Sequence, residues 1–141
     1  MAITFTSENV KLTLRQKTRL KNWVESVVKK EKKTAGDINY VFSNDDFLLK
    51  LNKQFLKHNT YTDIITFDYT EGKKISGDVF ISVDRVKDNA KKFKVKPQEE
   101  LLRVMIHGVL HLCGYKDKSK TDKATMRKKE NEALAYFKKM K

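Results

Sequence analysis

Residues 97–117 read PQEELLRVMIHGVLHLCGYKD, and this stretch decides how the chain folds. Pro97 suits the first turn of a helix, because its missing N–H would have no partner there. The residues that follow as far as Leu112 are apolar nearly all round, which predicts a helix buried in the core. Gly114 is placed to end that helix, because glycine readily adopts the left-handed conformation of a helix cap.

The segments on either side of this helix show strand and helix patterns. Strands are expected at residues 2–6, 37–43, 63–69 and 77–83, and further helices at about 13–32, 44–55, 84–93 and 121–140. Because strands and helices do not strictly alternate, the order predicts the α+β class, a small mixed β-sheet of about four strands with packed helices. A chain of 141 residues, 39% of them hydrophobic, is long enough for one core, so residues 1–141 are expected to form a single domain.

The charge of the chain points to an anionic partner. Lysine and arginine total 31 and aspartate and glutamate total 18, so the net charge is 31 − 18 = +13. Nucleic acid comes first, because its phosphates release counterions to basic side chains, although a lysine surface that only aids solubility is the alternative. The single cysteine, Cys113, excludes an intrachain disulfide. With no signal-peptide pattern and no apolar run near the ~20 residues that span a bilayer, a cytoplasmic protein without membrane contact is expected.

Two of the three histidines form the chemical centre of the sequence. His107 and His111 lie four residues apart, which places them on one face of the buried helix. Gly114 stops the helix, and Asp117 follows on a chain that must turn back. Two imidazoles and one carboxylate are a normal ligand set for a catalytic zinc ion with one position left for water. The alternative is a pair of histidines bonded to backbone carbonyls inside an apolar core.

Neighbouring residues limit this interpretation. Cys113 lies two residues from His111 and faces away from it, so a buried core thiol is expected rather than a ligand. In zinc proteases the residue after the first histidine is a glutamate that acts as general base. Here that position is Gly108, which argues against a protease. Phe93 is expected in the core, and Ser82 is expected to face solvent.

The string from His107 to Asp117 resembles the signature H-G-x-L-H-L-x-G-Y-D-H of the YbeY-like ribosomal-RNA maturation endoribonucleases. Further segments agree with the family in order and spacing: Leu51-Asn52, TDIITF at 62–67, GDVFIS at 77–82, and Met126 with Glu130. The resemblance implies a metal-dependent RNase fold with one Zn²⁺ ion, acting on small-subunit rRNA in ribosome quality control. Asp117 stands where the family has its third histidine. Leu56 stands where it has an arginine, with Lys57 and His58 beside it.

Together these observations predict a zinc-dependent, single-strand-specific endoribonuclease for rRNA maturation. The expected metal ligands are His107, His111 and Asp117, and the expected catalytic residues are His107, His111 and Asp63, the last orienting a ligand or a water. RNA is expected to meet Lys57, Lys116, Lys118 and Tyr115. The expected partners are ribosomal RNA and components of the small ribosomal subunit. The alternative is a ribosome-assembly RNA-binding protein whose metal is mainly structural and whose cleavage activity is negligible.

Overall fold

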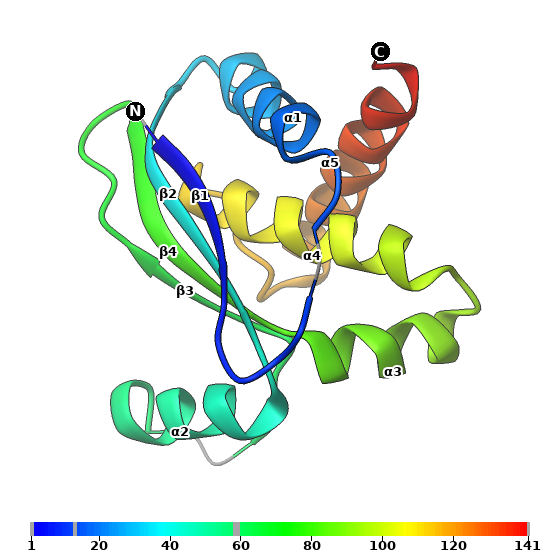
Figure 1. The fold of residues 1–141 in the computed structure, drawn as a ribbon. Coiled ribbons are helices and arrows are strands. Elements are labelled where there is room, and N and C mark those ends of the chain that lie inside the picture. Colours follow the sequence, from blue (N-terminus) through cyan, green and yellow to red (C-terminus); the bar gives the residue numbers. More distant parts are fainter. Residues whose placement is uncertain (1, 13, 58–59, 141) are drawn as a thin grey trace.

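The computed structural model describes residues 2–12, 14–57 and 60–140, and within them it contains a four-stranded sheet and five helices (Figure 1). The elements in chain order are β1 (Ala2–Ser7), α1 (Lys17–Lys30), β2 (Thr34–Ser43), α2 (Asp45–Phe55), β3 (Ile64–Asp68), β4 (Lys74–Ser82), α3 (Val83–Phe93), α4 (Pro97–Leu112) and α5 (Lys120–Lys139). This order is the one that the sequence predicts, and the α+β class is confirmed.

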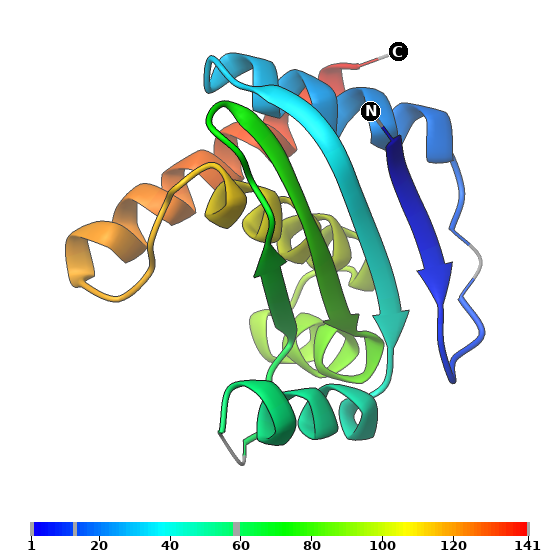
Figure 2. The same ribbon diagram turned by 90° about the vertical axis from the view of Figure 1, so that its left-hand side faces the viewer.

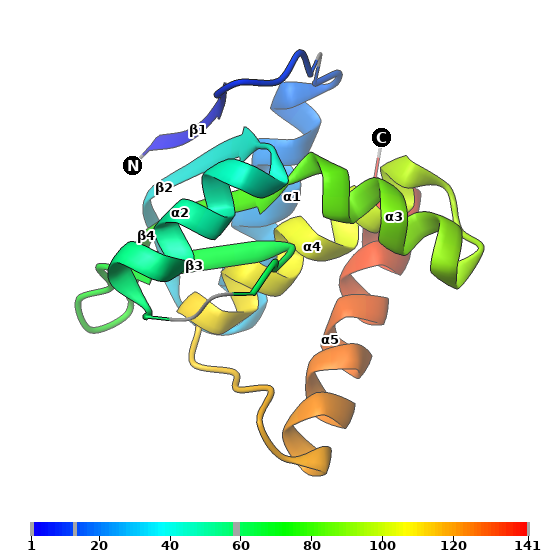
Figure 3. The same ribbon diagram turned by 90° about the horizontal axis from the view of Figure 1, so that it is seen from below.

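The sheet is mixed, with strand order β1-β2-β4-β3. β1 pairs with β2 and β2 with β4 in parallel, whereas β3 runs antiparallel to β4 at the edge. Helices α1 and α4 cover one face of the sheet, and α2 lies at the end of the strands (Figure 2). Helices α3 and α5 pack against α4, and the N-terminal end of α5 projects away from the sheet (Figure 3).

Helix α4 lies at the centre of the core, as its apolar sequence predicts. Met105, Ile106 and Val109 have no exposed surface. Tyr40 of β2 crosses the core, and its hydroxyl donates a hydrogen bond to the Met105 carbonyl at 3.0 Å. Gly108 lets α4 approach the sheet closely, because a Cβ atom there would lie only 2.9 Å from side-chain atoms of β3 and β4. In the part of the chain that the structure describes, no helix is both long and apolar enough to cross a bilayer.

The first helix begins later than its apolar pattern predicts. That pattern extends back to Thr13, which lies outside the described residues, but α1 begins at Lys17. Gln16 precedes it with a left-handed backbone, φ 58°, which a continuous helix does not allow. The apolar residues Leu12 and Leu14 pack against the core from an extended segment instead.

Ser82 and Phe93 occupy places opposite to those expected. Ser82 is fully buried, so the prediction of a solvent-facing side chain is wrong. Its hydroxyl caps α3 by accepting from the Arg85 N–H at 3.2 Å, and it donates to Asp45 at 2.7 Å. Phe93 is 51% exposed, so its predicted place in the core is also wrong. Cys113 is buried as predicted, and burial raises the pKa of its thiol to about 11.

Candidate metal centre

The chain reversal after α4 builds the centre. Gly114 has φ 107°, a conformation that glycine adopts without a steric penalty. Its N–H bonds to the His111 carbonyl at 2.9 Å, and the N–H of Tyr115 bonds to the Leu110 carbonyl at 3.0 Å. These two bonds form a Schellman cap. The cap turns the chain back along the helix and carries Asp117 to the face on which the histidines lie.

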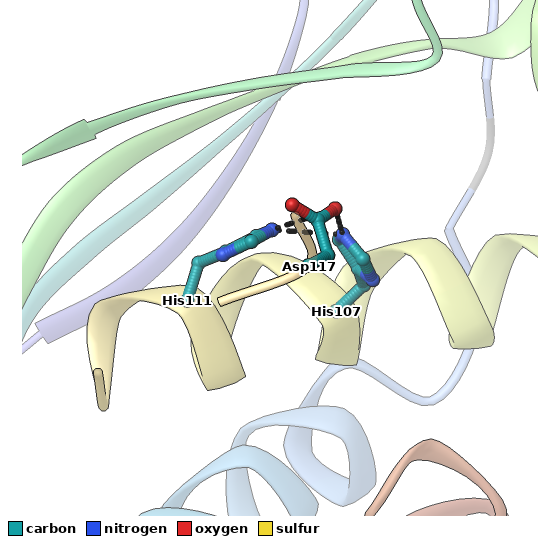
Figure 4. A group of neighbouring side chains, drawn as sticks. All are labelled: His107, His111 and Asp117. Carbon is teal, nitrogen blue, oxygen red and sulfur yellow. Dashed lines mark hydrogen bonds and ion pairs between the residues drawn. The ribbon is translucent and has the colours of Figure 1, made fainter. Parts of the chain in front are cut away.

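Three potential ligand atoms meet at this point (Figure 4). The Nε2 atoms of His107 and His111 are 2.9 Å apart, and each lies 3.4 Å from Oδ2 of Asp117. The two histidine side chains are 21% and 25% exposed, so the cluster opens to solvent rather than lying inside the core. The structure therefore brings together the three residues that the sequence analysis predicts as metal ligands.

The other ring nitrogen of each histidine is already engaged. His111 Nδ1 lies 2.8 Å from the Tyr115 carbonyl, which can only accept, so this nitrogen carries the proton. His107 Nδ1 lies 2.6 Å from Oε2 of Glu130 and donates to that carboxylate. In the form with the proton on Nδ1, each ring turns an Nε2 lone pair toward the same point. Because two facing lone pairs repel, a cation shared with the Asp117 carboxylate fits this donor set.

Glu130 of α5 contacts the cluster, although the sequence assigns it no role beyond its agreement with the family. Besides His107, its carboxylate contacts Arg103 at 3.0 Å and Arg127 at 3.8 Å. Burial opposes its ionisation, but hydrogen bonds from His107 and Arg103 hold the pKa of Glu130 below its ordinary value. Burial also disfavours the charged ring of His107, yet the bond to Glu130 raises the pKa of that histidine. Glu130 is therefore an ionised anchor for the orientation of His107.

A cavity of about 310 Å³ lies beside the cluster. His107, Asp117 and Glu130 line it together with Asp63, which precedes β3. Burial is the main cause that raises the pKa of Asp63, while the neighbouring His107 lowers it. The Asp63 carbonyl accepts from the Ser82 N–H at 2.9 Å, so the start of β3 is fixed in place. Asp63 thus reaches the cavity from the start of β3, 44 residues earlier in the chain than His107.

The predicted RNA contacts are spread over the surface. Lys116 and Lys118 are exposed on the loop that carries Asp117. Lys57 is exposed just after α2 and does not line the cavity, and its neighbour His58 lies outside the described residues. The Tyr115 hydroxyl donates to Glu31, the residue that follows α1, and the ring does not line the cavity either.

The position after His107 cannot supply a protease base. A Cβ atom on Gly108 would point at Ile64 and Val79 of the sheet, away from the ligand atoms. A glutamate there would therefore enter the core rather than reach a water at the cluster. This geometry agrees with the argument from sequence against a zinc protease.

Known proteins resemble the chain over nearly its whole length. A family model described as "Endoribonuclease YbeY" matches residues 2–138. The chain is 55% identical over 124 residues to the endoribonuclease YbeY of Flavobacterium psychrophilum, a match that covers 88% of this chain and 89% of that relative. It is 48% identical to the Parabacteroides distasonis protein of the same name, over 97% and 96% of the two chains. A Thermotoga maritima protein solved in solution superposes with a TM-score of 0.64 at 29% identity, over 98% of this chain and 93% of that one.

Proposed function

The chain belongs to the YbeY endoribonuclease family, and from this premise we propose that it is a zinc-dependent endoribonuclease that cleaves single-stranded RNA during rRNA maturation. His107, His111 and Asp117 hold the ion. The observation that carries the proposal is the convergence of three ligand atoms, all within 4.8 Å of one another, at the edge of a cavity. Two imidazoles and a carboxylate are a typical zinc set, although they also suit other divalent ions.

Each residue of the site has a separate task in this proposal. A divalent ion held by the three ligands supplies Lewis acidity toward the oxygens of a phosphodiester. Glu130 and the Tyr115 carbonyl fix the orientation of the two histidine rings. Asp63 is the group that takes up or returns a proton, because it is partly buried in the cavity and its pKa lies above the ordinary value.

The charge and the location of the protein follow from the same proposal. Lys116 and Lys118 flank the cluster and attract the phosphates of a single strand, with rRNA and the small ribosomal subunit as partners. The net charge of +13 supports RNA binding, whose affinity should fall steeply as salt is added. We place the protein in the cytoplasm, where a free thiol such as Cys113 stays reduced.

A second function is favoured by one observation. Leu56 takes the place of the family arginine and is 45% exposed, and Lys57 beside it lies outside the cavity. A lysine also lacks the planar fork with which arginine grips phosphate. The second candidate is therefore a ribosome-assembly protein that binds RNA with a structural metal and little cleavage.

One comparison separates the two functions. Nuclease-free wild type and His111→Ala are incubated with single-stranded rRNA fragments, with zinc present and after chelation. If the protein is the proposed enzyme, only the wild type with zinc present cleaves the RNA. Equal, slow degradation by both proteins refutes the nuclease function and leaves the RNA-binding function. Elemental analysis of untagged wild type and Asp117→Ala provides a second test, because the proposed site holds one zinc ion per wild-type chain.

A further inference from the structure

The cavity beside the metal ligands extends to parts of the molecule that the proposed metal site does not use. Its far wall is formed by Asn89 and Phe93 of α3, and its floor by Glu100 and Arg103 of α4. At about 310 Å³ it is at the small end of the range of ligand sites, which run from roughly 300 to 1,000 Å³. The cavity is therefore large enough for one small planar group next to the ion.

Phe93 offers this cavity an aromatic surface. It is the last residue of α3 and is half exposed, although the sequence analysis expects it in the core. Isolated exposed aromatic residues are common, but this one lines the same cavity as His107 and Asp117. Stacking of a base on such a ring is worth about 1–3 kcal/mol and suits any base, because every base has a π-face.

The polar groups of the cavity discriminate among bases. Asn89 lies four residues before Phe93 and so shares its helix face, and its amide donates only a long 3.4 Å bond to Asp63. Four carboxylates line the cavity against two guanidinium groups: Asp63, Glu100, Asp117 and Glu130 against Arg103 and Arg127. Both arginines already contact Glu130. Asp117 belongs to the metal cluster and Glu130 to these ion pairs, so the carboxylates of Asp63 and Glu100 remain to accept hydrogen bonds from amino groups.

We propose that this cavity is a nucleobase subsite. The base next to the cleaved phosphodiester stacks on Phe93, and its exocyclic amino group donates hydrogen bonds to the carboxylates and to the side-chain oxygen of Asn89. The proposal rests on the function proposed above. Cytosine, adenine and guanine carry such an amino group on their pairing edge, whereas uracil carries none. The phosphate itself stays at the ion, since His107 and Asp117 border both the cluster and the cavity.

Oligocytidylate and oligouridylate of equal length provide the test, because the two bases differ where the amino group replaces a carbonyl. Zinc-loaded wild type should cleave the cytidine strand with a kcat/KM roughly tenfold higher or more, as expected for a hydrogen bond to a charged acceptor. Phe93→Ala should raise KM by roughly 5- to 150-fold, the loss of one stacked base, with little change in kcat. Phe93→Trp should keep the wild-type KM.

A matched control uses an aromatic residue outside the cavity. Tyr69 is 59% exposed, close to Phe93 in exposure, and Tyr69→Ala should leave KM unchanged. Circular dichroism establishes that the variants fold. Equal cleavage of the two strands, together with an unchanged KM in Phe93→Ala, overturns the subsite while the nuclease stands. If wild type cleaves neither strand, the nuclease fails, and fluorescence anisotropy of the same strands still decides whether the cavity prefers cytosine.

Discussion

Gly108→Ala tests whether close packing of α4 on the sheet positions the two histidines. The added Cβ would lie 2.9 Å from Ile64 Cδ1, 2.9 Å from Val79 Cγ1 and 3.4 Å from Thr66 Cγ2, so the first two contacts are shorter than an ordinary van der Waals contact. Overpacking of this kind costs about 1–3 kcal/mol, and alanine regains about 1 kcal/mol over glycine in a helix. The net expectation is a loss of up to about 2 kcal/mol in the free energy of unfolding.

The same variant should bind zinc more weakly. Relief of the overlap shifts α4 from β3 and β4, and His107 moves with it relative to Glu130 on α5, the carboxylate that orients its ring. Urea unfolding followed by circular dichroism gives the stability, and competition with a chelating dye gives the zinc affinity. Ala124→Gly, in an exposed part of α5, measures the helix-propensity term alone. A Gly108→Ala protein about 1 kcal/mol more stable than wild type, with unchanged zinc affinity, would refute the reasoning.

Three further predictions follow from buried polar groups. Glu130→Gln should weaken zinc binding by roughly 10- to 100-fold while the metal-free protein stays folded, because the anchor of His107 loses its charge; an unchanged affinity in a dye competition would contradict this. Tyr40→Phe should lower the free energy of urea unfolding by about 1–3 kcal/mol, because the buried Met105 carbonyl loses its donor. Burial, followed by the charge of Asp63, raises the pKa of Glu100, so the stability tied to this group is complete below its ordinary pKa of 4.5 and is lost as the pH rises through the folded-state pKa. The free energy of unfolding of Glu100→Gln should therefore rise relative to that of wild type as the pH increases from acid to neutral. Parallel profiles of unfolding free energy against pH for the two proteins would exclude this effect.

Local patterns were enough to predict the elements and the ligand cluster. The apolar run that starts at Pro97 predicts the buried helix, and Gly114 marks its end. Both the formation and the termination of a helix depend on residues only a few positions apart, so both can be predicted from the sequence. The cluster of His107, His111 and Asp117 is predictable for the same reason, since the three residues lie within one helix turn and one cap.

The remaining parts of the site depend on contacts between distant segments. Glu130 reaches His107 across 23 residues and Asp63 reaches the cavity from another strand, and no periodicity predicts such meetings. Ser82 is buried because Asp45 at the start of α2 covers it, although strand alternation directs it outward. Phe93 is exposed rather than in the core, because it is the last residue of α3 and its apolar character alone does not show which elements cover that helix end.

The hydrogen bond from His107 to Glu130 joins two helices, and this has a thermodynamic consequence. An ion that binds the oriented His107 must stabilise the packing of α5 on α4. Because such coupling is reciprocal, a change that loosens α5 must lower the affinity for the ion by the same factor. Trp23, the one tryptophan of the chain, senses that docking: its indole N–H donates to the Ala133 carbonyl of α5 at 2.8 Å. Its fluorescence should therefore report metal occupancy from the contact between α1 and α5, without a probe at the site.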